Sequence, residues 1–305
     1  MDIKLAKSLT LTLVANISSN YGENLGNTAS VQKIFKNQKE YAARSRESLK
    51  NAICEQAGLY DDLKTVLNKE DSGNKKSVAQ KRVDTEVNAA NCRALEGGYM
   101  TTSKKMTYIR KSSFYLTDAI SVEPLINELR FHNNLQLANN YAKTRGLNVQ
   151  NKETGLMPYQ YEYDKSLKVY SITIDLERVG VDENFKAEAE NIEKAERVNS
   201  ILSAIETLSL VVKGNMDNAE PLFVIGGLST RKTHFFENVV KVKNNALVLN
   251  EGIESKLNSD IGNFKAGVLK CGQLDNEKDI VNQLNAETTS DFFNELRTEI
   301  DKYYR

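Results

Sequence analysis

The first fifty residues hold basic, amide and hydroxyl side chains in an order that suits the binding of an anion. Orphan amide groups and the macrodipole at the start of a helix favour negative charge, and serine commonly caps such a start. The residues concerned are Asn20, Asn24, Asn27, Lys33, Arg44, Ser45, Arg46, Ser48 and Lys50. We expect them to form a cradle for phosphate groups. The alternative is an ordinary helix whose basic first turn faces solvent.

Two later stretches combine glycine, aromatic and basic residues. Adjacent glycines allow close approach of the backbone to a ligand, although such a pair more often marks a turn. Basic side chains reach phosphates, and aromatic rings stack on bases. The candidates are Gly97, Gly98, Tyr99, Met100, Lys104, Lys105, Arg110, Lys111, Arg231 and Lys232. For the last two, which precede His234, Phe235 and Phe236, the alternative is an exposed loop above core phenylalanines.

Residues for nucleophilic or metal catalysis are scarce. The two histidines, His132 and His234, are far apart in the sequence, and no Ser/His/Asp or Cys/His spacing is evident. Cys54, Cys92 and Cys271 are odd in number and lack metal-ligand spacing, so we expect buried thiols. The sequence therefore predicts a binding protein that has neither a catalytic site nor a cofactor.

The elements that position these residues follow from periodicity. Residues 8–17 alternate as a half-buried strand, residues 20–27 form a loop over the sheet, and Ser45 begins a helix with an apolar stripe. The further expected elements are a helix at 59–68, a strand face of Phe114, Leu116 and Ile120, a hairpin at 159–176, a helix at 185–208, strands near 222–225, 246–249 and 266–269, and a C-terminal helix with Phe292, Leu296, Ile300 and Tyr303 on one stripe. The order βαββαβ predicts one α+β domain over 1–305, with the ferredoxin-like sheet of RNA-recognition (RRM-like) modules.

Residues 125–158 are too long for a simple connection in a compact domain, so we expect an insertion there. A second insertion is expected after the first helix, where residues 69–77 turn polar and charged. No signal peptide and no apolar run long enough for a bilayer is evident, which favours a cytoplasmic protein without membrane contact.

The neutral net charge hides two patches of opposite sign. Residues 75–111 contain nine basic and three acidic residues, whereas residues 182–220 contain nine acidic and four basic residues. This distribution suits a chain that binds a polyanion and packs against copies of itself. Solvated helix faces are the alternative for the acidic patch.

The residues at 13–33 (LVANISSNYGENLGNTASVQK) and 44–50 (RSRESLK) resemble the opening of the DevR-type CRISPR-associated RAMP proteins. Residues 97–121 resemble the family's Phe-Gly-Tyr-Met-like segment and its basic strand, although Gly97 stands where an aromatic residue is common and Glu96 precedes it. Lys213 and Asn215 match the family's turn before its last central strand.

The resemblance implies a backbone subunit of a type I-B Cascade complex in antiviral defence. Such a subunit polymerises along CRISPR RNA as a helical filament and presents the guide for pairing with a target DNA strand. The implied partners are the guide RNA, the paired target strand, copies of the chain, the large subunit and the subunit that caps the guide's 5′ end. Residues 59–96 would be the fingers and 124–166 the thumb.

Two other functions remain to be weighed. A target-RNA endonuclease like the type III backbone subunits would need an aspartate in the loop after the first strand. Residues 16–44 contain no aspartate, and Glu23 and Glu40 are their carboxylates. A transcriptional regulator is disfavoured because no helix-turn-helix signal is present.

Overall fold

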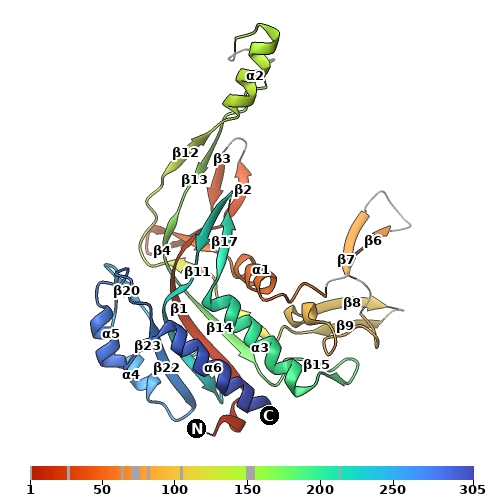
Figure 1. The fold of residues 1–305 in the computed structure, drawn as a ribbon, viewed down its shortest axis with the longest axis vertical. Helices are drawn as coiled ribbons and strands as arrows, with labels where there is room; N and C mark the ends of the chain where they lie inside the picture. The colour runs from red at the N-terminus through yellow and green to blue at the C-terminus, as the bar shows by residue number, and fades with distance from the viewer. Residues whose placement is uncertain are drawn as a thin grey trace.

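The computed structural model describes residues 2–25, 28–62, 65–69, 76–80, 83–103, 106–148, 155–212 and 214–305. Figure 1 shows a palm of sheet and helices from which a long arm and a shorter lobe project. Within the described ranges, no helix is long and apolar enough to cross a membrane.

The palm is built around β1 (Ser8–Ser18), whose residues are buried along almost their whole length. β1 pairs antiparallel with β14 (Lys165–Asp175) on one side and with β19 (Pro221–Ser229) on the other. The other strands of this nine-stranded sheet are β4 (Lys33–Lys36), β5 (Lys39–Arg44), β10 (Phe114–Leu116), β11 (Ala119–Ser121), β22 (Gly262–Val268) and β23 (Glu287–Thr288). The central order β19-β1-β14-β10/β11 is the ferredoxin-like arrangement, and the predicted α+β fold is confirmed.

Helices cover one face of this sheet. Leu9, Leu11 and Leu13 of β1 point into a core shared with these helices, as successive side chains of a strand alternate between faces. The helices are α1 (Arg46–Gln56), α3 (Asn191–Glu206) and α6 (Thr289–Tyr304). Phe292, Leu296 and Ile300 of the predicted stripe are buried, whereas Tyr303 is only partly buried and Tyr304 is buried in its place.

The C-terminal segment covers the opposite face. Val14, Phe223 and Ile225 belong to a second core with Phe236 and Ile253. This layer contains α4 (Glu251–Leu257), α5 (Glu277–Leu284), β20 (Val242–Lys243) and β21 (Ala246–Leu247). Both faces of the sheet are therefore covered by other elements, whereas an RNA-recognition sheet leaves one face open to RNA.

The arm consists of β12 (Leu129–His132), α2 (Leu135–Arg145) and β13 (Tyr159–Glu162), with β2 (Tyr21–Leu25) and β3 (Thr28–Val31) along its lower part (Figure 1). Its four strands form a separate sheet in the order β12-β13-β3-β2. Asn134 closes the arm below α2, because its Oδ1 accepts the Met157 amide at 2.8 Å and its Nδ2 donates to the Gly155 carbonyl at 2.9 Å.

The lobe contains β6 (Thr65–Lys69), β7 (Lys76–Gln80), the 3-10 turn η2 (Arg93–Gly97), β8 (Tyr99–Ser103) and β9 (Met106–Arg110). The small elements of the palm are η1 (Ile3–Leu5), β15 (Val181–Asp182), β16 (Ala187–Glu188), β17 (Ser209–Val212) and β18 (Asn215–Asn218). A minor core of Val83, Ala89, Cys92 and Leu95 packs the base of the lobe.

One predicted loop and one predicted helix are wrong, because each segment forms a strand that pairs with the next strand along the chain. Residues 21–25 are strand β2, which forms a hairpin with β3 in place of the expected loop. Residues 65–69 pair with β7, so the expected helix at 59–68 is a turn followed by a strand. Leu63, on which that helix partly rested, lies outside the described residues.

The predicted hairpin at 159–176 is also wrong. β13 pairs with β12 and β3 in the arm, whereas β14 pairs with β1 in the palm. The chain changes sheets at Asp164, where the ammonium of the buried Lys168 binds the carboxylate at 2.5 Å. Local adjacency in the sequence favoured a hairpin, but the better partners are distant.

The start of one helix and the extent of one strand differ from expectation. α3 begins at Asn191, since Phe185 and Ala189 belong to the preceding hairpin region, and Ile192 is 73% exposed. Ile120 is exposed in its own strand β11, while Phe114 and Leu116 are buried in β10.

Candidate nucleic-acid interface

The start of α1 is held by protein groups. Ser45 Oγ accepts the Ser48 amide at 3.2 Å, and Asn20 Oδ1 accepts the Ser45 amide at 2.8 Å. Asp118 Oδ1 accepts the Arg46 amide at 2.8 Å. The predicted cap is present and ties the end of β1 to the helix. However, the amides of Ser45, Arg46 and Ser48, which were expected to face a phosphate, already donate to side chains of the protein.

The two arginines beside Ser45 differ in accessibility. Arg44 is 5% exposed, its Nη1 donates to the Ser18 carbonyl at 3.3 Å, and burial lowers the pKa of its guanidinium. The Arg46 side chain is 59% exposed and pairs with Glu47 at 3.0 Å. Exposed ion pairs contribute little and exchange readily, so Arg46 is available to a ligand, whereas Arg44 is a structural residue.

Lys50 organises the neighbouring main chain. Its ammonium donates to Ser112 Oγ at 2.7 Å, to the Gly97 carbonyl at 3.3 Å and to the Phe114 carbonyl at 3.4 Å. It also lies 4.5 Å from the centroid of the Phe114 ring, and burial lowers its pKa. Because an ammonium has three donors, Lys50 positions Gly97 and Ser112 and leaves no free donor for a phosphate.

A groove opens beside these residues. It has a volume of about 270 Å³ and is lined by Arg46, Glu47, Lys50, Phe114, Tyr115 and Leu116. Lys111 is exposed and directly precedes Ser112, whose hydroxyl Lys50 binds. The groove thus combines apolar and aromatic lining side chains with an accessible cation, Arg46, and a carboxylate, Glu47.

Arg110 links several segments at the base of the lobe by hydrogen bonds. It is buried, and its guanidinium donates to the carboxylate of Glu96 at 3.1 Å and to the carbonyls of Leu95, Val181 and Arg178, each at 2.8 Å. Glu96 also accepts from Arg197 at 2.7 Å. In the same region, the hydroxyl of Tyr99 donates to Asp182 at 2.9 Å, and Met100 is 75% exposed on β8.

The remaining predicted residues do not gather at this groove. Lys33 binds Glu162 at 2.8 Å, Asn215 binds Asp217 at 2.8 Å, and Lys232 binds Asp175 and Glu177 at 2.7 Å. Arg231 and Lys232 lie at the Ser8 end of β1, where Ser8 Oγ donates to the Arg231 carbonyl. The length of β1 separates them from α1 by roughly 33 Å. Asn27, Lys104, Lys105, Lys213 and the Asn24 side chain lie outside the described residues.

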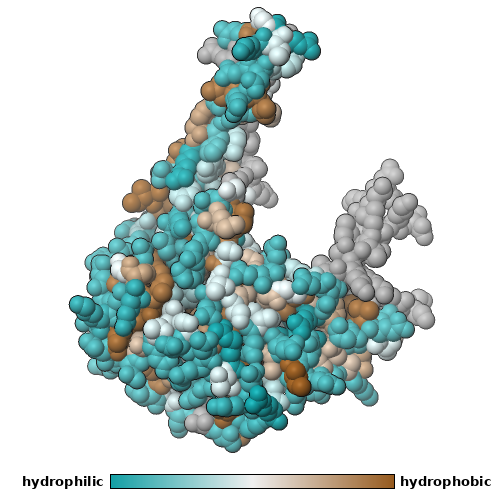
Figure 2. Space-filling view, viewed as in Figure 1, coloured by the Kyte–Doolittle hydropathy of each residue, from teal (hydrophilic) through white to brown (hydrophobic). Residues whose placement is uncertain are grey.

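The arm carries an aromatic row that we did not predict as part of the interface. His132 contacts Tyr161 through a 2.9 Å hydrogen bond, Tyr159 stacks near Tyr161, and Arg130 lies 3.5 Å from the Tyr163 ring centroid. The alternating tyrosines at 159, 161 and 163 were the available signal. Figure 2 shows further apolar side chains along the arm. The exposed apolar residues of this segment include Leu129, Phe131 and Met157.

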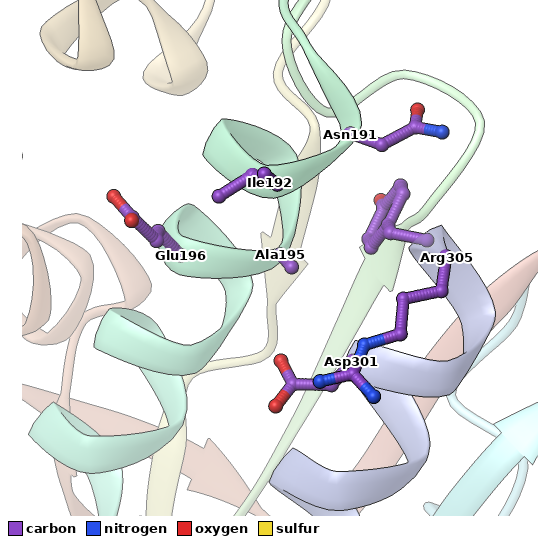
Figure 3. A pocket seen from close by; sticks show the side chains of 7 residues that line it. Asn191, Ile192, Ala195, Glu196, Asp301 and Arg305 are labelled. Atoms are coloured by element: carbon purple, nitrogen blue, oxygen red, sulfur yellow. The ribbon is translucent and has the colours of Figure 1, made fainter.

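A second groove, on the helical face, has different chemistry. It has a volume of about 550 Å³ and is lined by Asn191, Ile192, Ala195, Glu196, Asp301, Tyr304 and Arg305. Figure 3 shows the carboxylates of Glu196 and Asp301 on opposite walls, with Arg305 beside Asp301. Two carboxylates at its rim disfavour a polyanion.

Metal binding finds no support in the described ranges, where no three His, Cys, Asp or Glu side chains are grouped to hold an ion. The sheet face offers no base-stacking platform either, since the C-terminal layer covers it. The groove at the start of α1 is therefore our candidate for the interface.

Most of the chain matches a known protein family. A model of the CRISPR-associated negative auto-regulator DevR/Csa2 family matches residues 9–247. The chain belongs to the DevR/Csa2 family. The family predicted from residues 13–50 and 97–121 is thus confirmed, and no curated protein matches the chain.

Two solved structures share the fold of this DevR/Csa2 member. A chain of a "CRISPR RNA-guided surveillance complex, pre-nicking" has a TM-score of 0.64 and 10% identity, covering 97% of this chain and 100% of that one. A chain of a "CRISPR RNA-guided surveillance complex" has a TM-score of 0.56 and 14% identity, covering 97% and 98%. The TM-scores show a common fold, and at these identities the likeness shows the fold alone.

Proposed function

We propose that this DevR/Csa2-family chain is a non-catalytic, RNA-binding backbone subunit of a CRISPR surveillance complex. The observation that carries the proposal is the groove at α1, where the accessible Arg46 lies among aromatic and apolar lining residues and the exposed Lys111 directly precedes Ser112. Such a site suits phosphates and unstacked bases without a base code. The fold likeness to chains of RNA-guided complexes supports it.

In this proposal the arm is the thumb and the lobe belongs to the fingers. The arm's aromatic and apolar side chains suit contact with bases or with a neighbouring copy. Guide RNA, a paired target DNA strand, further copies and other complex subunits are the proposed partners, in the cytoplasm. The lobe as described extends past residue 96 through β9.

The first test replaces Arg46, a cation that lines the groove, and the exposed Lys111. The double variant Arg46→Ala/Lys111→Ala should bind single-stranded RNA more weakly across all sequences. Each lost phosphate contact should reduce the slope of log K against log salt by about 0.7. Fluorescence anisotropy over a salt series measures both. Arg231→Ala, an exposed arginine at the opposite end of β1, is the matched control. Equal losses in both variants would move the RNA path away from α1.

The second test concerns catalysis. The nuclease alternative rested on the loop after β1, but folding also brings Asp118 and Glu47 beside Arg46. Two carboxylates paired with an arginine, outside any metal-binding group of the described chain, do not form a cation site. We expect no Mg²⁺- or Mn²⁺-dependent cleavage of guide-paired RNA. Cleavage that Asp118→Asn abolishes, while RNA affinity stays unchanged, would establish the enzyme.

A further inference from the structure

The glycines of this chain can be sorted by what each one does for the fold. Of the fourteen that the structure describes, nine have φ between +63° and +153°, where other residues are strained. Three more, at 252, 262 and 267, would place a Cβ within 3.0 Å of another atom. Gly22 has ordinary contacts at 3.7 Å and beyond. Gly97 has no positive φ, and a Cβ there would meet nothing within 4 Å.

Gly97 and Gly98 are adjacent but differ completely. Gly98 has φ +87°, and its Cβ would lie 2.8 Å from the Ser112 amide nitrogen and 2.9 Å from the Arg110 carbonyl. The fold therefore requires glycine at 98. At 97 the fold gains nothing from glycine and loses stability, because a glycine has more conformational entropy to lose on folding than an alanine.

The main chain at Gly97 is nevertheless held in place. Its carbonyl accepts from Lys50, whose ammonium is fixed by Ser112 and by the Phe114 carbonyl. Lys50 also lines the α1 groove, so the Gly97 carbonyl is one hydrogen bond away from a groove-lining side chain, and the space beside the Gly97 Cα is open. A rigid, uncovered backbone beside a binding groove is suited to close contact with a ligand.

We propose that Gly97 is a close-approach position, at which one nucleotide of bound single-stranded RNA packs its sugar and base against the bare main chain. The 42% exposed Tyr115 provides the aromatic wall above the buried Phe114 and Leu116, and Arg46 provides the cation for the phosphate. This inference rests on the proposed RNA-binding function. In this site, the missing side chain of Gly97 leaves room for the nucleotide.

The test compares the melting temperature with the RNA affinity, because a substitution at Gly97 should leave the first unchanged or higher and make the second weaker. Gly97→Ala should melt at the same or a higher temperature than the wild type, because its backbone is compatible with alanine. It should bind labelled single-stranded RNA more weakly, and Gly97→Phe should lose about tenfold or more in affinity. The salt slope should stay unchanged, since no phosphate contact is removed. Anisotropy titrations and thermal melts of the same preparations give all three quantities.

Two controls separate the possible causes. Gly98→Ala should lower the melting temperature, which identifies a glycine needed for folding. Gln283→Phe places an aromatic ring on the exposed surface of α5 and should leave RNA affinity unchanged. Wild-type affinity in a folded Gly97→Phe variant, an equal loss in Gln283→Phe, or destabilisation by Gly97→Ala would each overturn the inference alone. Failure of the wild type to bind RNA would overturn the proposed function with it.

Discussion

The carboxylate of Glu96 lies between two buried arginines. It accepts from Arg110 at 3.1 Å, from Arg197 at 2.7 Å and from the Gly180 amide at 2.7 Å. These contacts join the lobe to α3 and to the turn after β14. Because Gly97 follows directly, the same network fixes the main chain whose carbonyl accepts from Lys50.

Removing this charge should be costly. Glu96→Gln leaves the desolvated guanidinium of Arg110 without its counter-ion and leaves Arg197 with Glu193 alone, and breaking a buried ion pair costs about 3–5 kcal/mol. Urea unfolding should show that loss. Glu196→Gln removes an exposed carboxylate from Arg93, which keeps Glu193, and should cost about 1 kcal/mol or less. Equal, small effects in both variants would mean that Glu96 is hydrated in solution.

At this scale the sequence predicted some roles and missed others. Ser45 as a helix cap depends on local geometry and was predictable. The burial of Arg44 and Arg110 was not, because the direction of a strand side chain depends on which strands pair with it. Arg44 lies opposite Ala119 of β11, seventy-five positions further along the chain.

Among the elements, the arm depends most on distant pairing. β12 and β13 are separated by α2, yet they pair over four residues and continue the β2–β3 hairpin into one sheet. Sequence periodicity indicated an insertion at 125–158 but not its content. Strands this short have weak patterns, and their partners are remote.

The tip of the arm should be removable without loss of folding. We predict that replacing residues 135–154 by a short glycine-serine linker leaves the melting temperature nearly unchanged, since Asn134 already holds Gly155 and Met157 together below α2. Fewer subunits should then bind a guide RNA of fixed length, because neighbour contacts and their multivalent gain are lost. Size exclusion with light scattering counts the subunits per RNA.

A charge variant makes this result specific. Lys143→Ala/Arg145→Ala keeps α2 but removes the cations of its last turn. If it lowers the stoichiometry as much as the deletion does, RNA attraction by the tip explains the effect. Full coating of the RNA by the shortened protein would contradict a role of α2 in assembly.

For the whole molecule, the order of elements was predictable but the second layer was not. The βαββαβ sequence gives the palm, since each long strand and helix has a clear period. The C-terminal layer is assembled from short strands and helices whose apolar residues meet Val14 and Phe223 only after folding. The acidic patch is explained in part: Lys194 and Arg197 are buried in ion pairs, which leaves α3 with an acidic surface.

The two described chain ends lie together, at the extremity of the palm farthest from the arm (Figure 1). Lys4 Nζ donates to the carbonyl of Tyr303 at 3.0 Å, which holds η1 against α6. A tether attached near either end would therefore anchor every molecule by the same side. On a sensor surface, the α1 groove and the arm would face the solution uniformly, so dissociation rates measured for different ligands would be directly comparable.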